Sequence, residues 1–166
     1  MTNLQVDDVE TPALLIDLEV LESNIATMKE KMKGKKCGYR PHVKAHKSPF
    51  IAQKQLASGA LGVTCQTIEE AEAMMLSGVQ EILLTNPAVT ESKIGRTLAI
   101  GANSSVAVTV DNAENVKALA SAAERKGRVL DVVVEVNVGQ NRTGVAPGKP
   151  ALELIRVVEG LRSLRF

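Results

Sequence analysis

The chain has 166 residues, a length typical of one domain, and 45% of them are apolar, enough for a sizeable core. Its 20 Lys and Arg nearly balance its 19 Asp and Glu, and only 2% of residues are aromatic, so we expect no nucleic-acid partner. Its two cysteines are too few for a disulfide framework. The polar N-terminus and the lack of a long apolar run predict a soluble cytoplasmic protein with no signal peptide and no membrane partner.

The first predicted elements alternate between strand and helix. Residues 11–17 are typical of a short strand, and Asp17 is placed to cap the helix that follows. That helix is predicted over 18–34, because apolar residues recur there at steps of three and four. A second strand is predicted over 38–44, and a Ser-Pro pair predicts the start of a helix over 48–59.

From residue 61 onward the alternation is regular. The predicted strands cover 61–65, 81–85, 105–110, 130–138 and 161–166, and the predicted helices cover 67–78, 90–99, 111–127 and 150–159. Two of these helices open with capping-box patterns, Thr67 to Glu70 and Asp111 to Glu114. A repeat of strand and helix predicts an α/β fold with a parallel sheet.

Two topologies fit this alternation, an open doubly wound sheet and a (β/α)8 TIM barrel. An open sheet usually carries a glycine-rich phosphate loop after its first strand, and residues 44–48 contain no glycine, which favours the barrel. A full barrel needs roughly 250 residues. We therefore expect a partial barrel of about five to six of the eight βα units, which is truncated or completed by a partner.

Two predicted strands carry polar side chains on one face. Arg40, His42 and Lys44 share a face of the second strand, and Glu135 and Asn137 share a face of the long strand near the C-terminus. In a barrel both faces would point to the axis, where opposite charges would compensate one another. The alternative is that both are solvated faces of a sheet covered on one side only.

Five segments of the chain carry a family resemblance: Thr11–Asp17, Arg40–Ser48, Gly62–Glu72, Ile82–Asn86 and Val138–Val145. In order and spacing they resemble the N-terminal part of the D-threonine aldolase and D-serine dehydratase group, which are fold-type III pyridoxal-phosphate enzymes of the alanine racemase type. The resemblance implies that residues 18–166 are an incomplete cofactor-binding barrel, truncated at the start of its sixth strand. It also implies that residues 1–17 hold a strand that would belong to a missing C-terminal β-domain.

The same resemblance implies roles for three residues. Lys44 would form the Schiff base with pyridoxal 5'-phosphate, and its place agrees with this role because barrel active sites lie at the carboxyl ends of strands. Burial and the basic neighbours of Lys44 would favour the unprotonated amine that such a lysine needs. Arg142 would contact the cofactor near its ring hydroxyl, and His42 would line the site. The alternatives are a surface-loop arginine and a core histidine.

The activity that the resemblance implies is that of a lyase on D-3-hydroxy amino acids, by retro-aldol cleavage to glycine and an aldehyde or by loss of water from D-serine. Family members also bind a divalent metal, Mn or Zn, through a C-terminal domain to which nothing here corresponds, so we assign no metal ligand. We expect the 166-residue chain alone to be inactive. Two alternatives are a racemase-like or cofactor-homeostasis barrel without lyase activity, and an incomplete, non-catalytic chain that survives by self-association. A strand at 11–17 would favour the enzyme, and open strand edges predict a homo-oligomer, most simply a dimer.

Overall fold

The computed structural model describes residues 5–166 and contains one parallel sheet whose strands follow each other in chain order. The strands are β1 (Val63–Cys65), β2 (Glu81–Leu84), β3 (Ser105–Val110), β4 (Leu130–Val134) and β5 (Leu164–Arg165). The α-helices are α1 (Leu18–Met32), α2 (Pro49–Ala57), α3 (Ile68–Leu76), α4 (Glu91–Ile100), α5 (Ala113–Arg125) and α6 (Lys149–Glu159), and the 3-10 helices are η1 (Val6–Asp8) and η2 (Val43–Ala45). The predicted α/β class and parallel sheet are confirmed.

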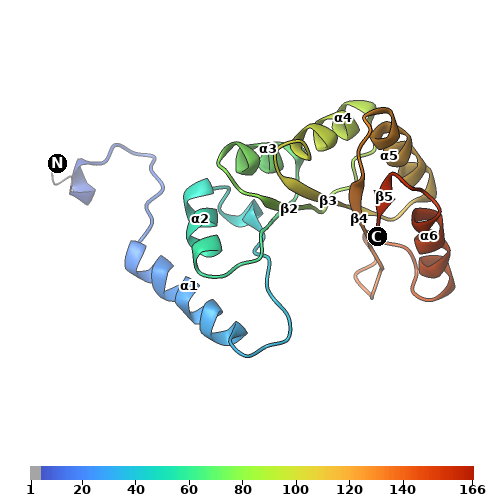
Figure 1. Cartoon of the computed structure of the whole chain (residues 1–166). Helices are drawn as coiled ribbons and strands as arrows, with labels where there is room; N and C mark the ends of the chain where they lie inside the picture. The colour runs from blue at the N-terminus through green and yellow to red at the C-terminus, as the bar shows by residue number, and fades with distance from the viewer. Residues whose placement is uncertain (1–4) are drawn as a thin grey trace.

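Helices α3, α4 and α5 lie along one side of the sheet (Figure 1). Right-handed crossovers between strands in sequential order place their helices on the same side, whereas a doubly wound sheet reverses its order and carries helices on both. Strand residues that face the helices are nearly inaccessible, as Val63, Val108 and Val132 show. On the opposite face Val133 is 43% exposed. The aliphatic core therefore fills the layer between the sheet and its helices.

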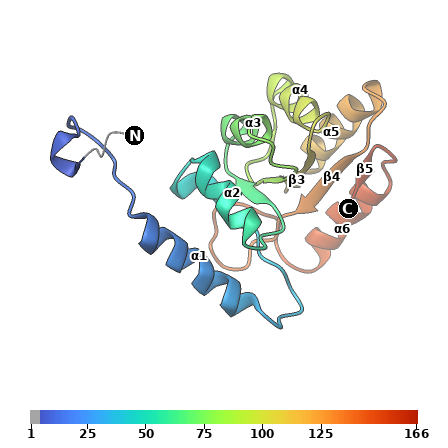
Figure 2. The ribbon, with the colours of Figure 1, turned by 60° about the vertical axis from the view of Figure 1, so that its left-hand side comes forward.

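The capping signals at two helix starts are confirmed. The Asp17 carboxylate accepts a hydrogen bond from the Val20 backbone N–H at 3.0 Å, and the Ser48 hydroxyl accepts one from the Ile51 N–H at 3.4 Å. Helix α1 itself has no buried residue and extends away from the sheet (Figure 2). The ion pair between Glu22 of α1 and Lys54 of α2, at 2.6 Å, links the two helices.

The strand predicted over 11–17 is wrong for this structure. These residues lie outside the sheet, and Leu14 is 93% exposed. An extended segment becomes a strand only when a neighbouring strand accepts its backbone hydrogen bonds, and no strand within residues 5–166 pairs with this one. The segment therefore gives no basis here for choosing between an enzyme and a carrier protein.

The strand predicted over 38–44 is reduced to a single bridge. His42 pairs in parallel with Thr64 of β1, and the chain then turns into η2. The turn forms because the backbone N–H groups of His46 and Lys47 both donate to the Val43 carbonyl, at 3.1 and 2.7 Å. The predicted alternation of faces therefore ends at His42, and Lys44 lies on a turn rather than in a strand.

Two further boundaries differ from the prediction. Strand β4 ends at Val134 instead of residue 138, and a bridge between Val136 and Val145 closes the loop that follows. Asn112, and not Asp111, caps α5. None of the helices within residues 5–166 is both long and apolar enough to cross a membrane.

Candidate functional site

The structure places Lys44 on an exposed turn at the carboxyl end of the sheet. The turn follows the bridge between His42 and Thr64 and precedes α2. The backbone N–H of Lys44 donates to Nδ1 of His42 at 3.3 Å, which fixes the imidazole beside the lysine backbone. Within residues 5–166 the side-chain nitrogen of Lys44 has no hydrogen bond or ion pair. It is therefore an unpaired amino group on a defined turn, and the burial expected for it from the sequence is not found.

Two histidines flank this lysine and favour their neutral forms. Burial lowers the pKa of His42, the nearby Lys44 charge lowers it further, and Glu70 and the backbone of Thr64 oppose these effects. Burial likewise lowers the pKa of His46, whose Nδ1 accepts from the Ser48 N–H at 3.0 Å. A neutral imidazole can accept or donate one proton near neutral pH, so His42 is a candidate proton-transfer group beside Lys44.

Glu70 is the acidic partner of this turn, a role that the sequence analysis missed. It is 8% exposed, and its Oε2 accepts from the Gln66 backbone N–H at 2.8 Å, while Oε1 lies 3.7 Å from Nζ of Lys47. Lys47 has a φ of 51°, a left-handed conformation that is uncommon outside glycine. The capping pattern that starts at Thr67 was the available signal, because it places Glu70 at the first turn of α3, next to the end of β1.

The expected compensation between the two polar strands is not found. Glu135 accepts from the Thr143 hydroxyl at 2.7 Å, and Asn137 bonds within its own loop. Neither residue forms a hydrogen bond or ion pair with Arg40, His42 or Lys44 in the described part of the chain. The reason is that β4 ends at Val134, so the two polar residues enter a loop in which Glu135 bonds a loop side chain and Asn137 bonds the loop backbone.

Arg142 lies in this loop after β4, at the same end of the sheet as Lys44, and its side chain is exposed. The loop is held by local hydrogen bonds to Asn137 and by a longer-range bond from the Gly144 N–H to Asp111. The structure thus brings the turn of Lys44 and His42 and the loop of Arg142 to the carboxyl end of one sheet. Within residues 5–166 no hydrogen bond or ion pair joins Arg142 to Lys44.

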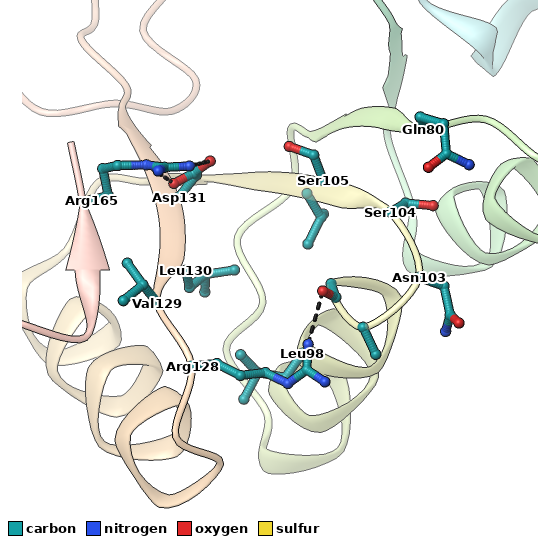
Figure 3. A pocket seen from close by; sticks show the side chains of 13 residues that line it. Gln80, Leu98, Asn103, Ser104, Ser105, Arg128, Val129, Leu130, Asp131 and Arg165 are labelled. Carbon is teal, nitrogen blue, oxygen red and sulfur yellow. Dashed lines mark hydrogen bonds and ion pairs between the residues drawn. The ribbon is translucent and has the colours of Figure 1, made fainter.

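A cavity of about 440 Å³ lies at the opposite, amino end of the strands (Figure 3). Its charged groups already have partners: Arg165 forms two hydrogen bonds with Asp131, at 2.6 and 2.7 Å, and Arg128 donates to the Gly101 carbonyl at 2.9 Å. It contains none of the predicted site residues. We therefore place the candidate site at the carboxyl end, where unpaired reactive groups lie.

Within residues 5–166, no group of three or more His, Cys, Asp or Glu side chains is arranged to hold a metal ion. Cys65 is buried, and burial together with the Glu70 charge raises the pKa of its thiol to about 12. The arrangement offers the unpaired side chain of Lys44, the imidazole of His42 in a setting that favours its neutral form, and the exposed side chain of Arg142. Such a set can bind an electrophilic carbonyl covalently and contact an anionic or hydroxyl group.

Comparisons with known proteins identify the family of this chain. Residues 16–166 match the family model described as alanine racemase, N-terminal domain. The chain is 37% identical over 158 residues to a D-threonine aldolase of Arthrobacter sp., covering 95% of this chain and 42% of that protein. Two solved structures are also similar. The D-threonine aldolase of Filomicrobium marinum has a TM-score of 0.94 at 40% identity, over 97% of this chain and 44% of that one. The D-threo-3-hydroxyaspartate dehydratase of Delftia sp. HT23 has a TM-score of 0.86 at 30% identity, over 95% and 42%.

The chain spans under half the length of these relatives. The family model nevertheless covers nearly all of the chain, and the fold agrees throughout the matched region. This chain belongs to the family of the alanine racemase N-terminal domain.

Proposed function

We propose that this chain is the cofactor-binding part of a pyridoxal-phosphate-dependent lyase that acts on D-3-hydroxy amino acids. One observation carries the proposal: the side chain of Lys44 is exposed and unpaired within residues 5–166, on a defined turn at the carboxyl end of the sheet, where enzymes with parallel α/β sheets bind ligands. The relatives named as an aldolase and a dehydratase support the lyase class. The proposed reaction of the whole protein is either aldol cleavage or loss of water.

The described residues fit the aldehyde of pyridoxal phosphate. Lys44 would bind the aldehyde carbon through its side-chain nitrogen, and His42 lies beside it as an imidazole whose lowered pKa favours the neutral form, able to move a proton. Arg142 would contact the cofactor near its ring hydroxyl, from the loop after β4. When bound, the cofactor supplies an electron sink for the negative charge that develops on the substrate.

We also propose that the sheet is part of a (β/α)8 barrel. Its sequential strand order, with helices on one side, supports this topology, and the bridge at His42 occupies the place of a first strand. In this proposal residues 18–166 form the incomplete barrel domain and residues 1–17 a separate N-terminal segment. The remaining strands, the phosphate-binding loop, a C-terminal β-domain and its divalent metal would belong to the part of the relatives that this chain does not match.

The test is covalent capture of the cofactor. The purified chain is incubated with pyridoxal phosphate, reduced with borohydride and analysed by peptide mass mapping. We expect the label on Lys44 and its loss in Lys44→Ala. Lys47→Ala is the matched control, because Lys47 is also exposed but is paired with Glu70, and this variant should keep the label on Lys44. Label on another lysine, or no label, would overturn the assignment of Lys44.

A second measurement addresses activity. We expect the 166-residue chain to release no aldehyde from D-threonine above the background of a Lys44→Ala control, since the proposed phosphate and metal sites lie outside it. Release by the purified monomer would contradict this division of the site. Sedimentation of the same sample tests the proposed dimer.

A further inference from the structure

The loop that carries Arg142 is folded around a single amide side chain. The Oδ1 atom of Asn137 accepts from the backbone N–H groups of Gly139 and Asn141, at 3.0 Å each, and its Nδ2 donates to Oδ1 of Asn141 at 3.0 Å. Asn141 has a φ of 55°, a left-handed conformation that Asn tolerates better than most residues. The backbone before Arg142 is therefore ordered by bonds within the loop.

A second anchor comes from a different βα unit. Directly after β3, Oδ2 of Asp111 accepts from the Gly144 N–H at 3.1 Å, across 33 positions of the chain. Asn112 caps α5 and leaves the Asp111 carboxylate available for this bond. On the other side of Gly144, an added Cβ would meet the Asn137 nitrogen at 2.7 Å, which shows how closely the two ends of the loop pack.

These two anchors enclose Arg142, which lies one residue after Asn141 and two before Gly144. We infer that Asp111 and Asn137 are positioning residues, which hold the loop so that Arg142 is presented at the carboxyl end of the sheet before any ligand binds. The functional half of this inference rests on the proposed contact of Arg142 with pyridoxal phosphate. Its structural half concerns only the hydrogen bonds of this chain.

The physical reason for such anchors is preorganisation. A free loop loses backbone entropy when it becomes ordered on a ligand, and this loss weakens binding. A carboxylate that accepts a backbone N–H forms a charge-assisted bond, stronger than a neutral one. Because Asp111 belongs to the β3–α5 unit, its bond ties the loop to a rigid element, whereas the bonds of Asn137 alone would allow the loop to move as a unit.

The test is a set of variants titrated with pyridoxal phosphate, with occupancy read from the borohydride-fixed label on Lys44. We expect Asp111→Ala to weaken the apparent affinity by about tenfold, the order of one charge-assisted bond. Asp111→Asn should restore most of it, since the amide oxygen still accepts the bond. The double variant Asp111→Ala/Arg142→Ala should bind no more weakly than Arg142→Ala alone. Additive losses, or no loss in Asp111→Ala, would overturn the inference. Asp131→Ala is the matched control, because this carboxylate lies at the amino end of β4 and pairs with Arg165.

Hydrogen exchange without ligand tests the positioning role separately from the proposed cofactor contact of Arg142. In Asp111→Ala the Gly144 amide should exchange at least tenfold faster than in the wild type, while amides of β3 and β4 keep their protection. Unchanged exchange at Gly144 would overturn the positioning role itself. If exchange changes but Arg142→Ala binds pyridoxal phosphate as well as the wild type does, the proposed role of Arg142 fails, and with it the functional half.

Discussion

Replacement of Gly144 by alanine tests how tightly the Arg142 loop is packed. Gly144 has a φ of 90°, where an L-residue is destabilised by about 1–2 kcal/mol. The new Cβ would also lie 2.7 Å from the Asn137 nitrogen and 2.8 Å from the Val136 carbonyl carbon, an overlap that costs about 1 kcal/mol or more. We therefore expect a loss of about 2–3 kcal/mol in the free energy of unfolding. If the loop shifts to avoid the overlap, it gives up the Asp111 bond, at a cost of about 1.5–3 kcal/mol.

Urea denaturation measures this loss, and Gly78→Ala is the matched control. Gly78 has a similar φ of 84°, but nothing lies within 4 Å of a Cβ built there. The control should therefore lose only the conformational part, about 1–2 kcal/mol. Limited proteolysis should cut the loop faster in Gly144→Ala than in Gly78→Ala. Equal losses of stability and equal cleavage in the two variants would refute the reasoning, because the close packing would then contribute nothing.

Three other predictions concern charge and access. The pKa of His42 lies below its ordinary value of 6.5. The stability that this shift contributes is therefore present above pH 6.5 and is lost as the pH falls through the lowered pKa. In urea titrations, His42→Gln should lose less stability than the wild type between pH 7.5 and 5. Arg96→Ala removes ion pairs to two glutamates of α3, so we expect a small loss of thermal stability that becomes smaller still in high salt, as thermal unfolding can show. In thiol labelling of the native chain at pH 8, exposed Cys37 should react at least a hundredfold faster than buried Cys65, whose pKa is about 12; equal rates would contradict the burial of Cys65.

All six α-helices and all five strands found within residues 5–166 could be predicted, at least in part, from the sequence because their signals are local. Apolar periodicity and caps such as Asp17 and Ser48 lie within the element that they define. The predictions fail where strand pairing or side-chain hydrogen bonds determine the structure. Residues 11–17 could form a strand only beside a neighbouring strand. The strand predicted over 38–44 ends at His42, because the His42 imidazole and the Val43 carbonyl accept backbone hydrogen bonds that close a turn.

The proposed reactive groups of the candidate site could be predicted from the sequence, but the residues that hold them in place could not. A lysine that follows an extended basic stretch can be read from residue order, as Lys44 shows. Asp111 and Asn112 are both favourable N-cap residues, so the sequence could not tell which one caps α5 and which one is left to bind Gly144. That choice depends on where β3 ends, and β3 ends at Val110, which pairs with Val134 of β4.

Glu70 and the proposed reactive groups also differ in burial, so different residues stabilise the fold and carry the proposed function. The side chains of Lys44 and Arg142 are exposed and unpaired within residues 5–166, so neither contributes much to the folded state. Glu70 is buried, accepts a backbone bond and holds Lys47, so its removal would leave polar groups unsatisfied and cost stability. In the proposed function, a lysine without such partners can bind a carbonyl without disturbing the fold. By the inference above, Asp111 and Asn137 hold the loop of Arg142 in place, as a preorganised site requires.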